Sequence, residues 1–273
     1  MEEGITELKN LSLDRINRLE KEKIVILLPI SPMEIHGNHL PIGQDILWSE
    51  VQMKIINELL NNKGYSCIQY PVIPLGAHVM YANKGYSQGF FTIKKILNNT
   101  IDILDSLGFK TIVICNAHGG PFHLLAIASA IEHANRHGIK CFSTLHSFIE
   151  NGLKEDFKLN GVKLSKDLHA GFIETSVALL EYPQLVEKNY KEYSYPRLKY
   201  LWYEKFMVNT LQVLWRIFKN DSMNWYFKDL VNWYFEKKFV NYLGYPDKAS
   251  KDYGKEINDF TRECFVKDIV SKI

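Results

Sequence analysis

Short apolar runs rich in β-branched residues alternate with helix-like segments over the first half of this chain, and this alternation limits its fold more than any other feature. The apolar runs are 23–30 (KIVILLPI), 65–73 (YSCIQYPVI), 110–115 (KTIVIC) and 139–144 (IKCFST). Segments with helical spacing lie between them, at 46–61, 92–107 and 121–137. Nearly continuous apolar strands separated by helices indicate a parallel sheet that is covered on both faces. The sequence therefore predicts an α/β fold with three layers, α/β/α, around a mostly parallel central sheet.

The helix predicted over 92–107 shows the pattern most clearly. Its sequence, TIKKILNNTIDILDSL, is followed by Gly108, a residue that often ends helices. The apolar residues form one broad stripe, which we expect to be buried: Ile93, Ile96, Leu97, Ile101, Ile103 and Leu104.

Composition excludes several classes of protein. The 273 residues include 33 Lys and Arg against 31 Asp and Glu, a net charge of +2, which gives no global electrostatic reason to bind nucleic acid or an anionic membrane. The opening residues MEEGITELKN do not resemble a signal peptide, and no apolar run approaches the ~18 residues of a membrane span. The 4 cysteines form no CxxC pair, so we expect reduced, buried thiols in a cytoplasmic protein.

Polar residues gather where the first predicted strand ends. The stretch SPMEIHGNHLPIGQD, at 31–45, contains Glu34, His36, His39 and Asp45. Carboxylates and imidazoles are costly beside an apolar interior unless something pairs with them. Such a set suits Zn, Mn or Fe(II) at a catalytic site. The alternative is a polar strand end whose histidines bind loop carbonyls.

Two further segments carry groups of the same chemical type. NAHGGPFH follows the strand 110–115 and presents His118. We expect His123 in the first turn of the next helix, either behind the metal ligands or at the surface, with the surface favoured. The segment lacks both GxGxxG and a P-loop lysine, so a nucleotide loop is disfavoured relative to a tight turn. DLHAGFIETS, at 167–176, contains His169 and Glu174, and taken alone its Glu174 and Ser176 are better explained as caps of a helix. Because parallel sheets bind ligands at the carboxyl ends of their strands, we expect the two loops after 23–30 and 110–115 to meet.

Taken together and in this order, the three segments resemble the creatininase family of metal-dependent amidohydrolases. The resemblance covers about 23–185 and resumes at 242–257, YLGYPDKASKDYGKEI, with GFFT at 89–92 as a shorter match. It implies that the metal-binding residues are Glu34, His36, Asp45, His118 and Glu174, with Asp45 bridging where two ions bind. It also implies one or two divalent ions (Zn, Mn or Fe) per subunit, proton transfer by His169 with Glu174 in support, and a homo-oligomer, plausibly a hexamer. His39 fits the family pattern, and we expect it either to support the metal ligands from behind or to fix the loop.

Three departures from the family pattern argue against creatinine as the substrate. Gly119 and Gly120 occupy the place of a metal-binding glutamate, Phe172 replaces an acid, and Pro121 replaces an asparagine. Residues 165–168 also lack the tryptophan expected beside a creatinine ring.

The region 190–242 differs in composition from the rest of the chain. It contains Trp202, Trp215, Trp225 and Trp233, many tyrosines and interleaved basic residues. Long helices with an aromatic buried face explain this better than base stacking on nucleic acid. We therefore expect one domain over 1–273 with a helical insertion at 190–242, which could be a lid, a specificity wall or a subunit contact.

The leading functional hypothesis is a hydrolase that uses metal-activated water to cleave a non-peptide C–N bond in a cyclic amide or formamide. One alternative is a formylaminopyrimidine-nucleotide deformylase or a peptide-maturation hydrolase of the same family. A second alternative is a metal-free domain that binds a small molecule or a partner.

Overall fold

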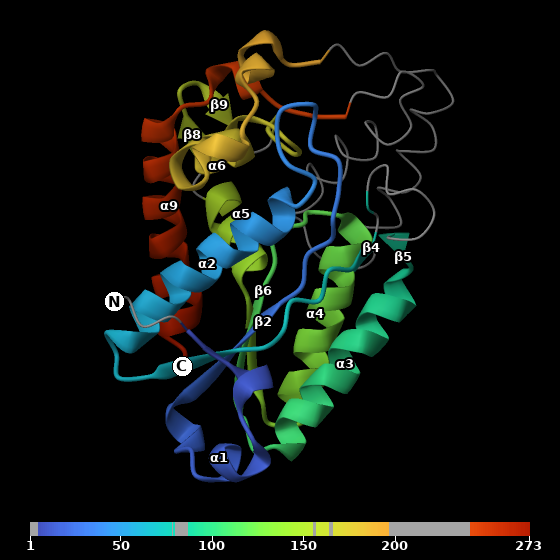
Figure 1. Ribbon diagram of the computed structural model, residues 1–273, viewed down its shortest axis with the longest axis vertical. Coiled ribbons are helices and arrows are strands. Elements are labelled where there is room, and N and C mark those ends of the chain that lie inside the picture. Colours follow the sequence, from blue (N-terminus) through green and yellow to red (C-terminus); the bar gives the residue numbers. More distant parts are fainter. Residues whose placement is uncertain (1–4, 78, 80–86, 155–156, 164–165, 197–240) are drawn as a thin grey trace. The chain divides into compact units, whose positions relative to one another are not determined.

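The computed structural model describes residues 5–77, 79, 87–154, 157–163, 166–196 and 241–273 (Figure 1). The described chain forms two compact units. We call the first, Met1–Glu34, Ile42–Phe148 and Asp259–Ile273, the sheet unit, and the other, Ile35–Pro41 and Ile149–Asn258, the second unit. Most of the predicted insertion at 190–242 lies outside the described residues, so its helices and its role stay predictions, as does the single domain.

The four predicted strands and the three predicted helices of the first half occur in the expected order, together with short elements that were not predicted. The strands are β1 Thr6–Glu7, β2 Ile24–Pro29, β3 Ser66–Gln69, β4 Gly76–Ala77, β5 Ser87–Gln88, β6 Thr111–Cys115, β7 Lys140–Ser143, β8 Lys158–Leu159 and β9 Val162–Lys163. The α-helices are α1 Leu13–Asn17, α2 Gln44–Asn61, α3 Phe90–Ser106, α4 Pro121–Arg136, α5 Thr144–Lys154, α6 Phe172–Glu181 and α9 Lys251–Phe265. Short helical turns lie at Leu8–Asn10, Lys21–Lys23, Pro183–Leu185, Lys188–Glu192, Pro246–Lys248 and Val266–Val270.

The five-stranded sheet of the sheet unit has the order β1-β3-β2-β6-β7, and all its neighbouring strands are parallel. This confirms the α/β fold with a mostly parallel central sheet. The strand predicted at 65–73 is shorter than expected, because regular pairing ends at Gln69 and only an isolated bridge joins Ile30 to Ile73.

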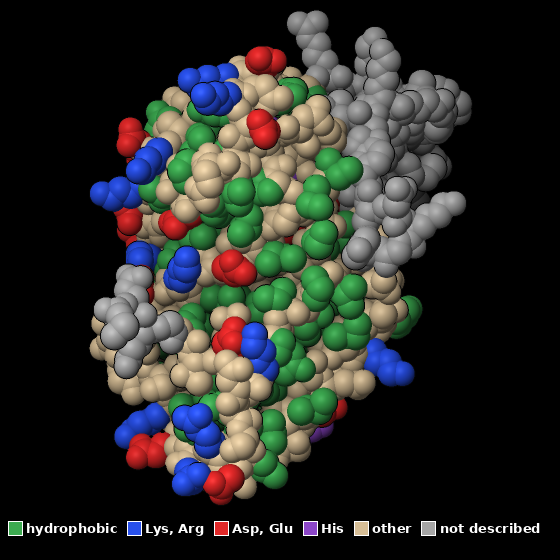
Figure 2. Space-filling view, in the orientation of Figure 1, with side chains coloured by type: hydrophobic (Ala, Val, Ile, Leu, Met, Phe, Trp, Pro, Cys, Tyr) green, Lys and Arg blue, Asp and Glu red, His purple; other side chains and the backbone are tan. Residues whose placement is uncertain are grey.

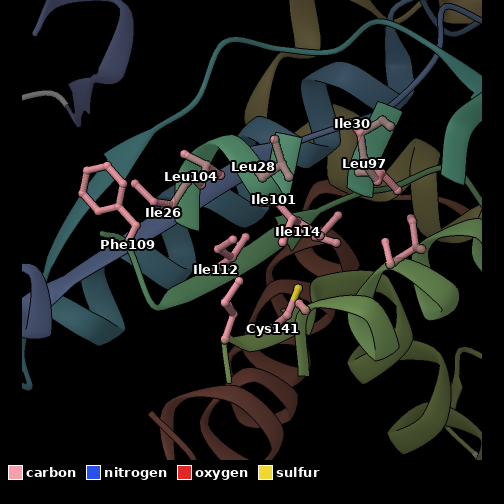
Figure 3. Packing of buried hydrophobic residues seen from close by; sticks show 14 of the residues in the cluster. Ile26, Leu28, Ile30, Leu97, Ile101, Leu104, Phe109, Ile112, Ile114 and Cys141 are labelled. Carbon is pink, nitrogen blue, oxygen red and sulfur yellow. The ribbon is translucent and has the colours of Figure 1, made fainter. Parts of the chain in front are cut away.

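The two faces of the sheet are covered by different helices. Side chains alternate along a strand, so Ile26 and Leu28 of β2 share one face with Ile112 and Ile114 of β6. This face packs against α3 and α4, which lie side by side (Figures 1 and 3). The opposite face, which includes Leu27, is equally buried and packs against α2. The arrangement is the predicted three-layer α/β/α architecture.

Helix α3 buries a narrower stripe than the sequence predicted. Ile93, Leu97, Ile101 and Leu104 are fully buried, whereas Ile103 is 54% exposed and Ile96 is only partly buried. Ile103 follows Ile101 by two positions, which rotates it about 200° around the helix axis and away from the core. The helix ends as expected, since Gly108 has φ +85° and the N–H of Phe109 donates to the carbonyl of Leu104.

The described surface mixes charges and scattered apolar side chains. On the described part of the face in Figure 2, Lys and Arg side chains are interspersed with Asp and Glu. All four cysteines are free and buried, as predicted. No helix in the described part of the chain is both long enough and apolar enough to span a bilayer.

Candidate metal centre

Three predicted ligands come together in the sheet unit. Glu34 lies in the loop after β2, His118 lies in the loop after the neighbouring parallel strand β6, and Asp45 is in the first turn of α2. Nδ1 of His118 lies 2.9 Å from Oε2 of Glu34 and 3.3 Å from Oδ2 of Asp45. One potential ligand atom of each residue lies within 4.8 Å of those of the other two. All three side chains are buried, so the carboxyl ends of two adjacent strands bring these groups together as the topology predicted.

The electrostatics of this trio fit a divalent cation. Burial by itself lowers the pKa of His118, but the carboxylates of Glu34 and Asp45 outweigh burial and hold that pKa well above its usual value. Two buried carboxylates around one imidazole therefore form a site that favours positive charge. Two oxygen donors and one nitrogen donor are a set that Zn, Mn and Fe(II) accept in catalytic sites.

Two other residues orient the His118 loop. The side-chain oxygen of Asn116 accepts from the N–H of His118, and the Asn116 side-chain nitrogen donates to the His118 carbonyl, both at 3.0 Å. Nε2 of His118 donates to the carbonyl of Ala77 at 3.1 Å, because a carbonyl oxygen can only accept. The other ring nitrogen, Nδ1, is therefore the one directed at the carboxylates.

A second group of predicted residues comes together in the second unit. Nε2 of His36 lies 3.6 Å from Oε2 of Glu174, and the rings of His36 and His169 have centroids 4.3 Å apart. Nε2 of His169 donates to the carbonyl of Ile35 at 2.8 Å. The chain passes from the sheet unit to the second unit between Glu34 and Ile35, so Glu34 and His36 belong to different units although they are near neighbours in sequence.

His39 contacts a helix of the second unit. It is fully buried, and its Nε2 lies 3.0 Å from the hydroxyl of Thr175 on α6. Burial, with the nearby His36 and His169, lowers the pKa of His39 to about 4. A neutral, buried imidazole bonded to a helix hydroxyl matches the loop-fixing role expected from the sequence.

Comparison with known proteins identifies the family. The family model for creatininase, described as creatinine amidohydrolase, matches residues 9–269. The chain belongs to the creatininase family. No curated protein matches it, so the remaining similarity is to solved structures.

The similar structures support the fold. A putative creatinine amidohydrolase from Bacteroides fragilis is 21% identical, with a TM-score of 0.65 over 96% of this chain and 94% of that one. A manganese form of creatininase is 18% identical, with a TM-score of 0.63 over 98% and 99%. A Zn-Zn form of a creatininase mutant is 17% identical, with a TM-score of 0.63 over 98% of each chain. The fold is that of these creatininases and is consistent with a metal-dependent amidohydrolase, and the metals named belong to the relatives.

The structure explains why residue 120, where this chain departs from the family pattern, is a glycine. A Cβ atom on Gly120 would lie 2.4 Å from Nε2 of His118 and 2.6 Å from the carbonyl oxygen of Ala77. No side chain fits there while His118 holds its contact with Ala77. The loop after β6 therefore brings one potential ligand, His118, to the trio and has no room for a carboxylate at 120.

Sequence reasoning misplaced His123. It was expected at the surface, but it is fully buried, with Nδ1 accepting from the N–H of Ala77 at 3.3 Å and Nε2 3.1 Å from the side-chain oxygen of Asn116. Burial, followed by the charge of His118, lowers the pKa of His123 well below its usual value. The helical pattern of 121–137 could not reveal this, because the contact with Ala77 comes from a distant strand.

Sequence reasoning also missed Asp167 as the residue that caps α6. The side chain of Asp167 accepts from the N–H groups of Phe172 (2.6 Å), Ile173 (2.7 Å) and Tyr245 (3.1 Å). The capping expected of Ser176 was wrong, because its hydroxyl accepts from the N–H of Ser250, whereas Glu174 accepts from the N–H of Ala170 at 2.7 Å, just before α6 begins. Asp167 escaped notice because it precedes Phe172 by five positions, whereas the usual N-cap signal immediately precedes the helix.

Proposed function

We propose that this chain is a metal-dependent hydrolase that cleaves a non-peptide C–N bond in a small cyclic amide or a formamide. The observation that carries the proposal is the buried trio of Glu34, Asp45 and His118, which pairs two carboxylates with one imidazole nitrogen. Family membership supports the same class of chemistry, and the departures at Gly120, Phe172 and Pro121 speak against creatinine as the substrate.

The proposed ligands are Glu34, His36, Asp45, His118 and Glu174, which would hold one or two ions of Zn, Mn or Fe per subunit. A divalent ion supplies Lewis acidity, which lowers the pKa of water and polarises an amide carbonyl. Asp45 and Glu34 provide the negative charge that keeps a cation in a buried site.

His169 would transfer the proton that the departing nitrogen needs. An amine leaves poorly unless it is protonated, and an imidazole with a reference pKa near 6.5 exchanges protons readily at neutral pH. Nε2 of His169 donates to the Ile35 carbonyl at 2.8 Å, which fixes the orientation of the ring. Glu174 would support the step from α6, where the N–H of Ala170 orients its carboxylate.

We expect a small-molecule amide substrate, no nucleic acid, no membrane contact and a homo-oligomer, with a hexamer as the first size to test. The free, buried cysteines support a cytoplasmic location.

The first test measures metal content in purified wild type and in Asp45→Asn. The proposal predicts stoichiometric Zn, Mn or Fe in wild type and its loss in Asp45→Asn. Asp102→Asn makes the same change at an exposed residue of α3 and should keep the metal. A wild type without stoichiometric metal would instead favour the metal-free binding domain.

The second test measures hydrolysis by metal-reconstituted protein across lactams, cyclic ureas, formamides, a formylaminopyrimidine nucleotide and short peptides. We expect the wild type to hydrolyse a lactam, a cyclic urea or a simple formamide. If His169 is the general acid, His169→Ala should lower the rate of hydrolysis about 10²–10⁴-fold. His137→Ala, at an exposed histidine of the sheet unit, is the matched control. Turnover of only the nucleotide or the peptides would select the alternative activities, and full activity of His169→Ala would refute its proposed role.

A further inference from the structure

A single backbone residue connects two buried histidine rings beside the candidate metal centre. The N–H of Ala77, in β4, donates to Nδ1 of His123, and the carbonyl of the same residue accepts from Nε2 of His118. The two rings are edge to face, with centroids 5.1 Å apart. Ala77 therefore holds both rings through its own donor and its own acceptor.

These contacts fix which nitrogen of each ring carries a proton. Nδ1 of His123 must be unprotonated because it accepts from an N–H group, so Nε2 carries the proton of the neutral ring and donates it to Asn116. The orientation of the Asn116 amide agrees, since its oxygen also accepts from the N–H of His118. In His118 Nε2 carries a proton, so Nδ1, on the side of Glu34 and Asp45, is the nitrogen whose lone pair a bound cation would take.

We propose that His123 is a positioning residue of the metal centre: through the backbone of Ala77 it sets the orientation of His118 and makes Nδ1 the nitrogen that binds the metal. The inference rests on the proposed metal-dependent function, but it concerns two residues that the function itself does not specify: His123 and Ala77. Groups that hold the second nitrogen of a ligating histidine typically change metal affinity about 10–100-fold when they are removed. His123 does not contact the His118 ring nitrogen itself. It accepts from the N–H of Ala77, and the carbonyl of Ala77 accepts from the His118 ring.

Gly120 lies directly against the contact between His118 and Ala77. The contact between His118 and Ala77 occupies the space that a Cβ atom at this position would need. A substitution at Gly120 therefore tests the contact between His118 and Ala77 without changing the His123 side chain.

The first experiment uses the wild type alone. Zn²⁺-loaded protein with ¹⁵N-labelled histidine is studied by long-range ¹H–¹⁵N correlation, which distinguishes protonated, unprotonated and metal-bound ring nitrogens. We expect His118 to show a protonated Nε2 and a metal-bound Nδ1, and His123 to show a protonated Nε2 and an unprotonated Nδ1. Zinc on Nε2 of His118, or a proton on Nδ1 of His123, would overturn the proposal.

The second experiment compares zinc affinities by competition with a chromophoric chelator. His123→Leu leaves the N–H of Ala77 without its acceptor and should weaken zinc binding about 10–100-fold. His123→Asn should recover most of this affinity, because the Asn oxygen is the same number of bonds from the backbone as Nδ1 of histidine. His133→Leu, on the same helix α4 but in contact with Asp102, should bind zinc as the wild type does.

If His123→Leu does not fold, Gly120→Ala provides the second measurement and should show a similar loss. Wild-type zinc affinity in a folded His123→Leu or in Gly120→Ala would overturn the positioning role while leaving the metal centre in place. A wild type that binds zinc and hydrolyses nothing would refute the proposed reaction and leave the positioning role standing. A wild type that binds no zinc would overturn both.

Discussion

Helices α6 and α9 approach each other closely at Gly254. Two opposing effects decide how a substitution by alanine there changes the free energy of unfolding. A Cβ atom at this position would lie 2.2 Å from the carbonyl oxygen of Ser176 and 2.9 Å from Cβ of Leu180. Ser176 and Leu180 belong to α6, which also carries Glu174 and Thr175. We therefore predict that Gly254→Ala destabilises the protein.

The opposing effect is helix propensity, since alanine in a helix interior is favoured over glycine by about 1 kcal/mol. Non-bonded carbon atoms approach to about 3.5 Å, so the added methyl group would force the two helices apart by roughly 1 Å. Overpacking of this kind typically costs ~1–3 kcal/mol, and the upper end applies here because a backbone carbonyl cannot rotate away alone. The expected net loss in the free energy of unfolding is about 2 kcal/mol after the propensity gain is subtracted.

Equilibrium unfolding in urea, followed by circular dichroism, measures this difference as a lower midpoint at an unchanged slope. Gly89→Ala is the matched control, because a Cβ atom there meets nothing within 4 Å and φ is −73°. Gly89 is the N-cap of α3, so Gly89→Ala should lower the free energy of unfolding by no more than about 1 kcal/mol. Gly254→Ala with wild-type or greater stability would mean that propensity outweighs the contact, and the close approach of α6 and α9 would be refuted.

Three further predictions concern the core, the start of α6 and the thiols. Leu97→Ala should cost ~2–5 kcal/mol in urea unfolding, against under about 1 kcal/mol for the half-exposed Ile103→Ala, and equal losses would contradict the burial of α3. Asp167→Ala leaves three backbone N–H groups without their acceptor and should cost about 3 kcal/mol or more, whereas a loss as small as that of the exposed Asp102→Ala would refute its capping role. Burial raises the pKa of Cys67 and Cys141 to about 12, so at pH 8 very few of these thiols are ionised. Mass spectrometry should show slow iodoacetamide labelling of the native protein and fast labelling in urea, and rapid native labelling would contradict the burial of these thiols.

The sequence predicted the secondary structure well wherever a long periodic pattern was present. The helices expected at 46–61, 92–107 and 121–137 are α2, α3 and α4, each within two residues at either end. It failed at Ile103, because an apolar residue on a helix is not buried unless the layer packed against that helix reaches it.

The grouping of the candidate ligands could be predicted from the sequence only in part. Glu34, Asp45 and His118 were expected together because they follow neighbouring parallel strands or open the next helix, and those positions share one edge of a sheet. The burial of His123 was missed because it depends on the N–H of Ala77, which is distant in sequence. The capping by Asp167 was missed because Asp167 lies five positions before Phe172 and not next to the helix.

The sequence by itself determined the chemical types at the candidate centre, the strands that carry them and the family to which the chain belongs. Hydrophobic periodicity and strand connectivity are properties of the chain, so they can be read before it folds. Only the tertiary structure decided which nitrogen of His118 faces the two carboxylates. That choice depends on a hydrogen bond to Ala77, 41 residues earlier in the chain, and a contact over such a separation exists only when β4 packs beside the loop.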